Sequence, residues 1–132
     1  VNIDVKPGSD PNPINVKSKG LTPVAVLSGI FFDAKNINVN SVLFAGASPQ
    51  KSAFEDVNDD GLDDLVLHFD TRSLNLSAKS TEAVLTGSLH DGSLIKGSDS
   101  IKMLQVSEKQ SVISRLMRFL AAMVYSVITL WE

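Results

Sequence analysis

Short runs of apolar and polar residues, separated by turn-forming residues, recur along the chain from Val1 to Val106. Residues 1–6 alternate strictly between apolar and polar side chains, a pattern typical of a strand with one buried face. Similar runs predict further strands at residues 14–17, 21–27, 39–44, 52–55, 65–69, 81–89, 94–96 and 100–106. Pro23 cannot donate a backbone hydrogen bond, so we expect the 21–27 strand to lie at a sheet edge or to begin near this residue.

Turn signals lie between these predicted strands. The prolines and the glycine of residues 7–13 exclude regular structure there, and Asp91-Gly92 is a strong hairpin signal. Residues 31–35 are predicted to form a single helical turn, and residues 71–74 a turn. Because the short strands recur at intervals of about 8–12 residues, the pattern predicts an all-β fold, an antiparallel Ig-like or jelly-roll-like β-sandwich of about seven to nine strands.

The segment from Asp56 to Asp64 carries oxygen-bearing side chains at every second position and a glycine at its sixth. Calcium takes about six to eight oxygen ligands, and a loop supplies them from alternate positions, with a glycine at the sixth for the sharp turn. The predicted ligands of a Ca²⁺ ion are the side chains of Asp56, Asn58, Asp60 and Asp64, the last directly or through water, and the backbone carbonyl of Leu62. Asp59 and Asp63 lie at even positions, and we expect them to face solvent.

This segment departs from the full EF-hand loop at its far end. The twelfth position, where a bidentate glutamate is usual, is Leu67. Residues 65–69 form a β-branched and aromatic run that predicts a core strand in place of an exit helix. The missing ligands are left open between Glu55, Asp70, Asp33 and water.

An alternative interpretation is that aspartate, asparagine and glycine gather here because they suit tight turns. The charges argue against it. The turn would draw Asp56, Asp60 and Asp64 together, and three carboxylates on one short loop repel one another unless a cation neutralises them. An incomplete ligand set also predicts weak binding, with a Kd of about 10⁻⁴–10⁻³ M, which is useful where calcium is plentiful, outside the cell.

Composition narrows the classes of function. With 132 residues the chain fits one domain and a tail, which we place at residues 1–106 and 107–132. A net charge of −3 gives no basic footprint for nucleic acid, and the lack of cysteine excludes disulfides and thiolate metal sites. His68 and His90 are the only histidines, so we expect no catalytic pair and no enzyme. Carbohydrate binding is left open but has no support, because Trp131 and Tyr125 both lie in the tail and no aromatic platform is evident.

Several motifs together resemble a β-sandwich module that recurs in secreted and surface proteins of bacteria and archaea. The similarity covers about residues 1–104 and is carried, in order, by residues 3–12, 14–15, 17–20, 23–27, 32–34, 55–69, 85–87, 91–93 and 97–101. The segment from Asp56 to Asp64, which we call the metal loop, also resembles the calcium loops of dockerins and of calcium-bearing adhesion repeats. The resemblance implies an extracellular or cell-surface, calcium-binding accessory module without enzymatic activity.

The composition changes after Gln105, where this resemblance ends. Ser107-Glu108-Lys109-Gln110 is a capping box ahead of an apolar run, which favours a helix beginning near Glu108. A strand that completes another subunit's sheet is the alternative, because several residues of the run are β-branched. We place packing against protein, the chain's own sandwich or a second copy, ahead of a membrane span, because the uncharged run 119–131 is shorter than the roughly 20 residues that a span needs.

The predicted function is therefore a non-enzymatic, calcium-stabilised accessory or adhesion module of a secreted or cell-surface protein. The alternative is a structural subunit of an extracellular filament or other homo-oligomer, assembled through residues 107–132 or by strand donation.

Overall fold

The computed structural model of the chain describes residues 1–104, which form nine strands. The helix or strand predicted within residues 107–132, with the partner it would pack against, lies outside the described residues. A four-stranded antiparallel sheet has the order β1-β3-β6-β5, with bounds Ile3–Val5, Leu21–Val26, Asp64–Asp70 and Lys51–Glu55. A three-stranded antiparallel sheet has the order β4-β7-β8, with bounds Ile37–Phe44, Glu82–Leu89 and Leu94–Ser100.

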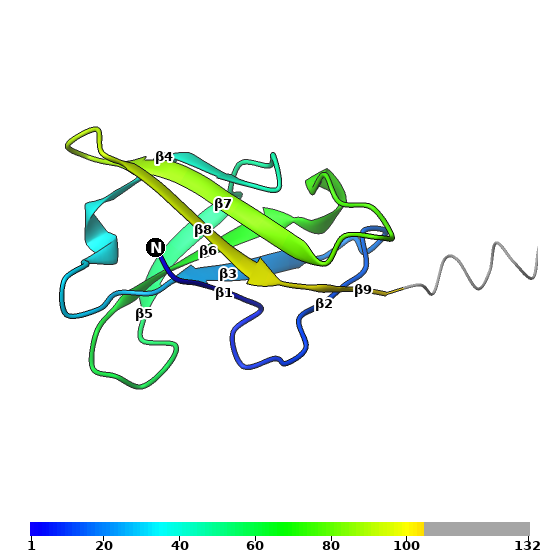
Figure 1. Ribbon diagram of the computed structural model, residues 1–132, viewed down its shortest axis with the longest axis horizontal. Helices are drawn as coiled ribbons and strands as arrows, with labels where there is room; N and C mark the ends of the chain where they lie inside the picture. The colour runs from blue at the N-terminus through cyan, green and yellow to red at the C-terminus, as the bar shows by residue number, and fades with distance from the viewer. Residues whose placement is uncertain (105–132) are drawn as a thin grey trace, which may run out of the picture.

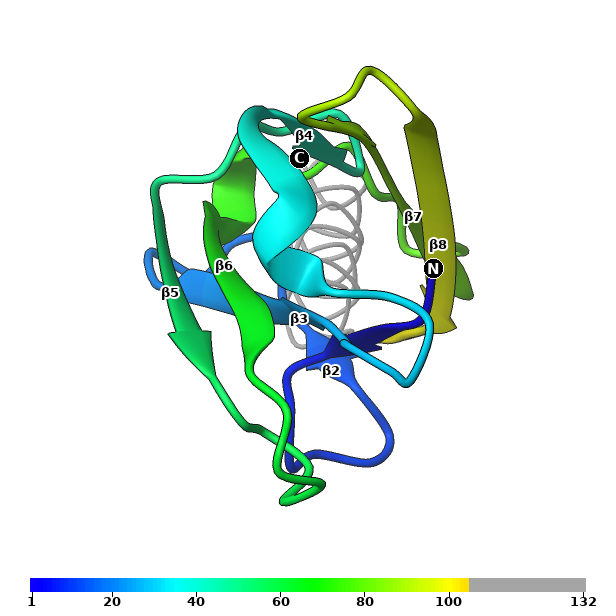
Figure 2. The same ribbon diagram turned by 90° about the vertical axis from the view of Figure 1, so that its left-hand side faces the viewer.

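The two sheets lie in separate layers with the hydrophobic core between them (Figures 1 and 2). β6 contributes Leu65, Leu67 and Phe69 to this core, and β4 contributes Val42 and Phe44. The rings of Phe44 and Phe69 meet across it with centroids 5.2 Å apart. Burying each such large side chain contributes about 1.5–3 kcal/mol. The predicted all-β, antiparallel sandwich is confirmed.

Three short elements complete the described fold. The strands β2 (Pro13–Ile14) and β9 (Lys102–Met103) pair in parallel, which the sequence did not predict. Two 3₁₀ turns, η1 (Ala34–Asn36) and η2 (Thr71–Ser73), follow aspartates whose side chains accept from the backbone two residues on. The predicted helical turn at 31–35 is therefore displaced toward η1, because Asp33 caps it. Within residues 1–104, no helix is long and apolar enough to cross a membrane.

β3 occupies an interior position in its sheet, so of the two predicted alternatives the edge position is wrong, while the strand does begin near Pro23, at Leu21. Pro23 is the third residue of the strand and is paired with His68 of β6. It is tolerated because β1 ends at Val5, opposite Val24, so the side of Pro23 that lacks a donor faces the point where β1 leaves the sheet. The backbone N–H of Lys6 donates to the Pro23 carbonyl there, at 2.8 Å.

The strand predicted at residues 14–17 is also wrong beyond its first residue. β2 ends at Ile14, and the chain then turns. The side chain of Asn15 accepts from the backbone N–H of Lys17 at 3.1 Å, and the Asn15 carbonyl accepts from Ser18 at 2.9 Å. Such a local side-chain bond competes with a strand ladder and favours the turn.

The break predicted between residues 96 and 100 does not occur, because β8 continues through Gly97 to Ser100. The start of the chain packs against this part of β8. The backbone N–H of Val5 donates to the Asp99 carboxylate at 2.9 Å, and a Cβ on Gly97 would lie 2.7 Å from the Val1 carbonyl oxygen. Glycine therefore serves close packing here and does not mark a turn.

Candidate metal centre

The segment from Asp56 to Asp63 closes the hairpin between β5 and β6. Glu55 and Asp64 are paired in register at its base. β6 follows directly and is a core strand, with Leu65, Leu67 and Phe69 in the core and Val66 and His68 on the other face. The predicted exit from the loop into a core strand is confirmed, so the loop is anchored directly to the hydrophobic core.

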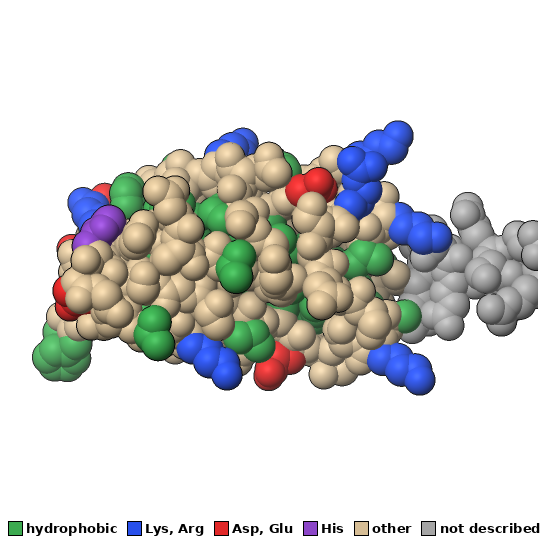
Figure 3. Space-filling view, turned by 90° about the horizontal axis from the view of Figure 1, so that it is seen from above, with side chains coloured by type: hydrophobic (Ala, Val, Ile, Leu, Met, Phe, Trp, Pro, Cys, Tyr) green, Lys and Arg blue, Asp and Glu red, His purple; other side chains and the backbone are tan. Residues whose placement is uncertain are grey.

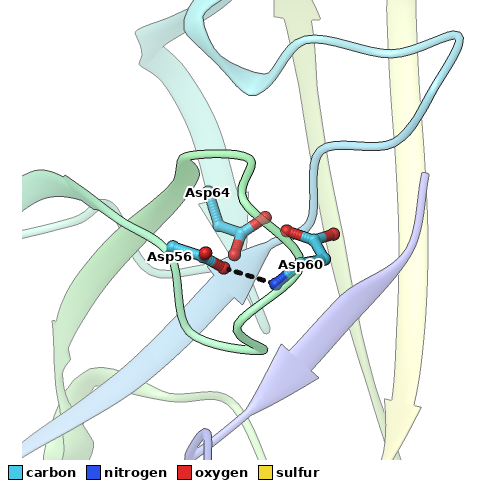
Figure 4. A group of neighbouring side chains, drawn as sticks. All are labelled: Asp56, Asp60 and Asp64. Atoms are coloured by element: carbon cyan, nitrogen blue, oxygen red, sulfur yellow. Dashed lines mark hydrogen bonds between the residues drawn. The ribbon is translucent and has the colours of Figure 1, made fainter.

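Three carboxylates converge inside this loop, as Figure 4 shows. One oxygen each from Asp56, Asp60 and Asp64 lies within 4.8 Å of the others. Calcium–oxygen distances are about 2.3–2.6 Å, so two oxygens on one ion lie at most about 5 Å apart. The three predicted carboxylate positions are therefore brought together at a spacing that could hold a metal ion.

The backbone of the loop turns toward Asp56. Its carboxylate accepts from the N–H groups of Gly61 at 2.8 Å and Asp60 at 3.2 Å. The Gly61 N–H, as the principal donor, holds the pKa of Asp56 below its ordinary value. Gly61 has φ +84° and Asp59 has φ +57°, left-handed conformations that glycine and aspartate adopt readily. The glycine at the sixth position thus permits the sharp turn that aims these donors at the carboxylate.

Asp64 is fully buried, and both of its oxygens accept backbone hydrogen bonds. One bond comes from Ser28 at 2.8 Å and the other from Val57 at 3.0 Å. A carboxylate has about four acceptor positions, so two remain available to a cation. Asp64 therefore joins the loop to the segment that follows β3.

Ser28 is a site residue that the sequence did not reveal. Besides its bond to Asp64, its hydroxyl donates to the Asp63 carbonyl at 2.6 Å and accepts from the Ala34 N–H at 2.9 Å. Ser28 is buried and links the metal loop to the turn before η1. A serine at the end of a strand pattern carries no signal of this role, because its partners lie 35 and 36 residues away.

The side-chain amide of Asn58 lies against the same carboxylates. In one orientation its nitrogen donates to Asp56 Oδ1 and to Asp60 Oδ1, each at 3.0 Å. In the reverse orientation the amide oxygen faces the two carboxylate oxygens, an arrangement that a cation would favour and that repels without one. Asn58 therefore fits the loop with or without a cation, depending on the orientation of its side-chain amide.

The other predicted residues lie around the group in different ways. Asp59 and Asp63 are exposed, as predicted, and Asp63 pairs with Lys35 at 3.6 Å. The backbone N–H of Leu62 donates to Asp60 at 2.9 Å, while its role as a carbonyl ligand stays a prediction.

Of the residues proposed for the missing ligands, none belongs to the three-oxygen group. Asp70 is at the far end of β6, about 20 Å from Asp64 at the usual rise per residue. Asp33 instead caps η1, and Glu55 is exposed at the end of β5. Distance thus excludes Asp70, while Glu55, Asp33 and water stay predictions for completing the coordination sphere.

The donors of this centre are all oxygens, which are the ligands of hard cations. The loop could therefore hold a metal ion between its three carboxylates. Comparison with known proteins gives no relative: no protein-family model matches the chain, and neither a curated protein nor a solved structure matches it.

Proposed function

We propose that the protein is a non-enzymatic module of a secreted or cell-surface protein whose fold is stabilised by Ca²⁺. The observation that carries this proposal is the convergence of Asp56, Asp60 and Asp64 within 4.8 Å on the loop that joins two strands of the sandwich. Without a cation these carboxylates repel one another, and with one they hold the hairpin closed.

Calcium fits the loop better than other common metals. Magnesium demands near-ideal octahedral geometry and keeps several waters, whereas calcium accepts an irregular set of oxygens. Zinc and copper prefer nitrogen and sulfur ligands, which the loop does not offer. The missing bidentate glutamate implies a Kd of about 10⁻⁴–10⁻³ M, a range suited to extracellular calcium.

The effect of calcium in this proposal is to stabilise the fold. Asp64 is bonded to Ser28, and Ser28 is bonded to the turn before η1. An ion on Asp64 would thus secure β6, the β5–β6 loop and the segment after β3 together. Since the unfolded chain lacks the preformed site, calcium at 100 times its Kd would add about 2.7 kcal/mol to the free energy of unfolding.

Thermal unfolding of the full chain in calcium, in magnesium and in chelator tests this function. We expect the melting temperature to rise with calcium concentration, and to rise much less with magnesium. Asp60→Asn should abolish the calcium response, because it removes a converging carboxylate. Asp59→Asn is the matched control: it removes the same charge from the adjacent, exposed position and should keep the response. Identical midpoints in calcium and chelator would refute the proposal.

A further inference from the structure

Two large apolar side chains project from the tip of a tight turn beside the metal loop. Ile30 is 91% exposed and Phe31 is 100% exposed. Gly29 and Phe32 close the turn by exchanging backbone hydrogen bonds of 2.8 and 3.3 Å. Turn tips usually carry glycine or short polar residues. A single exposed apolar residue is ordinary, but an adjacent pair held away from the core on a closed turn is not explained by the fold.

The end of the sandwich that bears this turn is strongly acidic. A pocket between the turn and the metal loop is lined by residues of both, among them Phe32, Asp33, Leu62 and Asp63. Figure 2 looks directly at this end. Its loops, residues 28–36, 55–64 and 90–93, carry eight of the thirteen carboxylate side chains of residues 1–104 and a single lysine, Lys35. We call this surface the acidic end.

The opposite end of the sandwich is basic. Its segments, residues 15–21, 45–51, 70–82 and 101–104, carry six lysines and arginines against two carboxylates. Several Lys or Arg side chains are visible in Figure 3, coloured blue, at the right-hand end of the described part of the molecule. We call this surface the basic end.

The basic end also contains a pocket with one apolar side. It has a volume of about 250 Å³, and Ile14, Leu21 and Leu104 form its apolar side. The rest of its lining is mostly polar and includes Lys6, Asn15 and Thr71. Leu21 is 44% exposed and Leu104 is 41% exposed, so the pocket is open to solvent. A cavity of about 150 Å³ is enough to hold a benzene ring, so an aromatic side chain fits a pocket of this size.

We propose that the acidic end of one copy docks on the basic end of a second copy, with Phe31 inserted into the pocket lined by Ile14, Leu21 and Leu104. The same chain carries both halves of this contact: an apolar projection among carboxylates, and a partly apolar pocket lined by Lys6 with the exposed Lys17 and Lys19 beside it. Such a head-to-tail contact uses two different surfaces, so each bound pair leaves one acidic end and one basic end free, and further copies join into rows.

Charge favours a second copy of the chain over a membrane as the partner of the acidic end. An anionic membrane surface would repel eight carboxylates, and a bound calcium ion would neutralise only two of those charges. A basic protein surface attracts them, with an attraction that salt screens. The contact between copies does not require the metal ion. Evidence against this contact would therefore leave the proposed calcium function intact.

Sedimentation velocity of the full chain at constant saturating calcium, over a wide range of concentrations, tests the contact. We expect concentration-dependent association that weakens as salt is raised. The double variant Ile30→Ser/Phe31→Ser should weaken it at least about tenfold, because the apolar area buried by Phe31 is lost. Lys17→Glu/Lys19→Glu, on exposed residues beside the pocket, should weaken it as well.

Leu43→Ser is the matched control, because Leu43 is an exposed leucine of β4 on the side of the sandwich, and it should associate as the parent does. Mixing the two double variants is the decisive measurement. Each retains one intact end, so the mixture should form a one-to-one complex that grows no further, while neither variant associates alone.

A parent chain that stays monomeric at every concentration would overturn the proposal. So would association that Ile30→Ser/Phe31→Ser leaves unchanged, which would point to the edge of β5 or to residues 105–132. Binding to lipid vesicles without self-association would assign the projecting turn to a membrane and also overturn it. Calcium-dependent melting of each variant confirms folding and reports separately on the proposed function.

Discussion

The carboxylate of Asp64 has two tasks that can be separated. It is buried and accepts the backbone N–H groups of Ser28 and Val57, and it also faces Asp56 and Asp60 in the metal loop. The first task exists without metal, because both N–H groups would otherwise lose a partner. Asp60 has only the second task, since its other side-chain bonds, from Leu62 and from the Asn58 amide, lie within the loop.

Asp64→Ala should therefore destabilise the protein even in chelator. Leaving buried donors unpaired costs about 1–3 kcal/mol, so urea unfolding in chelator should show a loss of that size. Asp60→Ala should show little loss in chelator and should differ from the parent only when calcium is present. Equal behaviour of the two variants would contradict this division of tasks.

Asp4 gives a pH dependence unrelated to the metal loop. Burial, with the charge of Asp99 as the smaller cause, raises the pKa of Asp4 above its ordinary value of 3.8. The folded state therefore holds this proton more tightly than the unfolded state. The stability that results is complete below pH 3.8 and is lost as the pH rises through the raised pKa of the folded state.

Asp4→Asn should remove this loss. We expect the variant to be more stable than the parent at neutral pH, with the difference shrinking toward zero as the pH falls below 3.8. Melting temperatures measured from pH 3 to pH 7 in chelator check the trend. Asp10→Asn, at an exposed position on the following loop, should show no such trend. A difference that stays constant with pH would contradict the role of ionisation.

The predicted strands match the observed strands where the sequence pattern reflects burial, and they differ from them where it reflects local turn chemistry. β6 and β7 follow their apolar patterns closely, because the core requires those side chains. β8 runs through glycine and serine residues that resemble a turn, because β1 packs against it. Contacts between strands distant in the sequence override local propensity at that point.

Gly97→Ala tests this contact between β1 and β8. The added Cβ would lie 2.7 Å from the Val1 carbonyl oxygen and 2.9 Å from Ile3 Cγ2. Since the strand must move away, we expect a loss of about 1–3 kcal/mol in the free energy of unfolding, measured in urea. Gly29→Ala is the control, because nothing lies within 4 Å of its Cβ position, and it should be nearly neutral. A neutral Gly97→Ala would mean that β1 is not held against β8.

The net charge of the chain is modest, but acidic and basic side chains are separated along the long axis of the sandwich. Antiparallel strands return the chain to the same two ends, so loops from distant parts of the sequence gather there. The metal loop, the turn before η1 and the β7–β8 hairpin all lie at one end, and the lysine-rich turns at the other (Figure 1). This arrangement brings the three converging carboxylates to one end and leaves most lysine and arginine side chains of the described loops at the other.

The sequence alone determined the β-sandwich class, the core strand β6 and the residues that converge in the metal loop. These depend on alternation and on spacing within one short segment, where neighbours in the sequence are also neighbours in space. Tertiary structure decided the rest: the pairing of Asp64 with Ser28, the interior position of β3, the length of β8 and the clustering of charge at the two ends. Each of these depends on contacts between residues far apart in the chain, and local pattern carries no information about which distant residues meet.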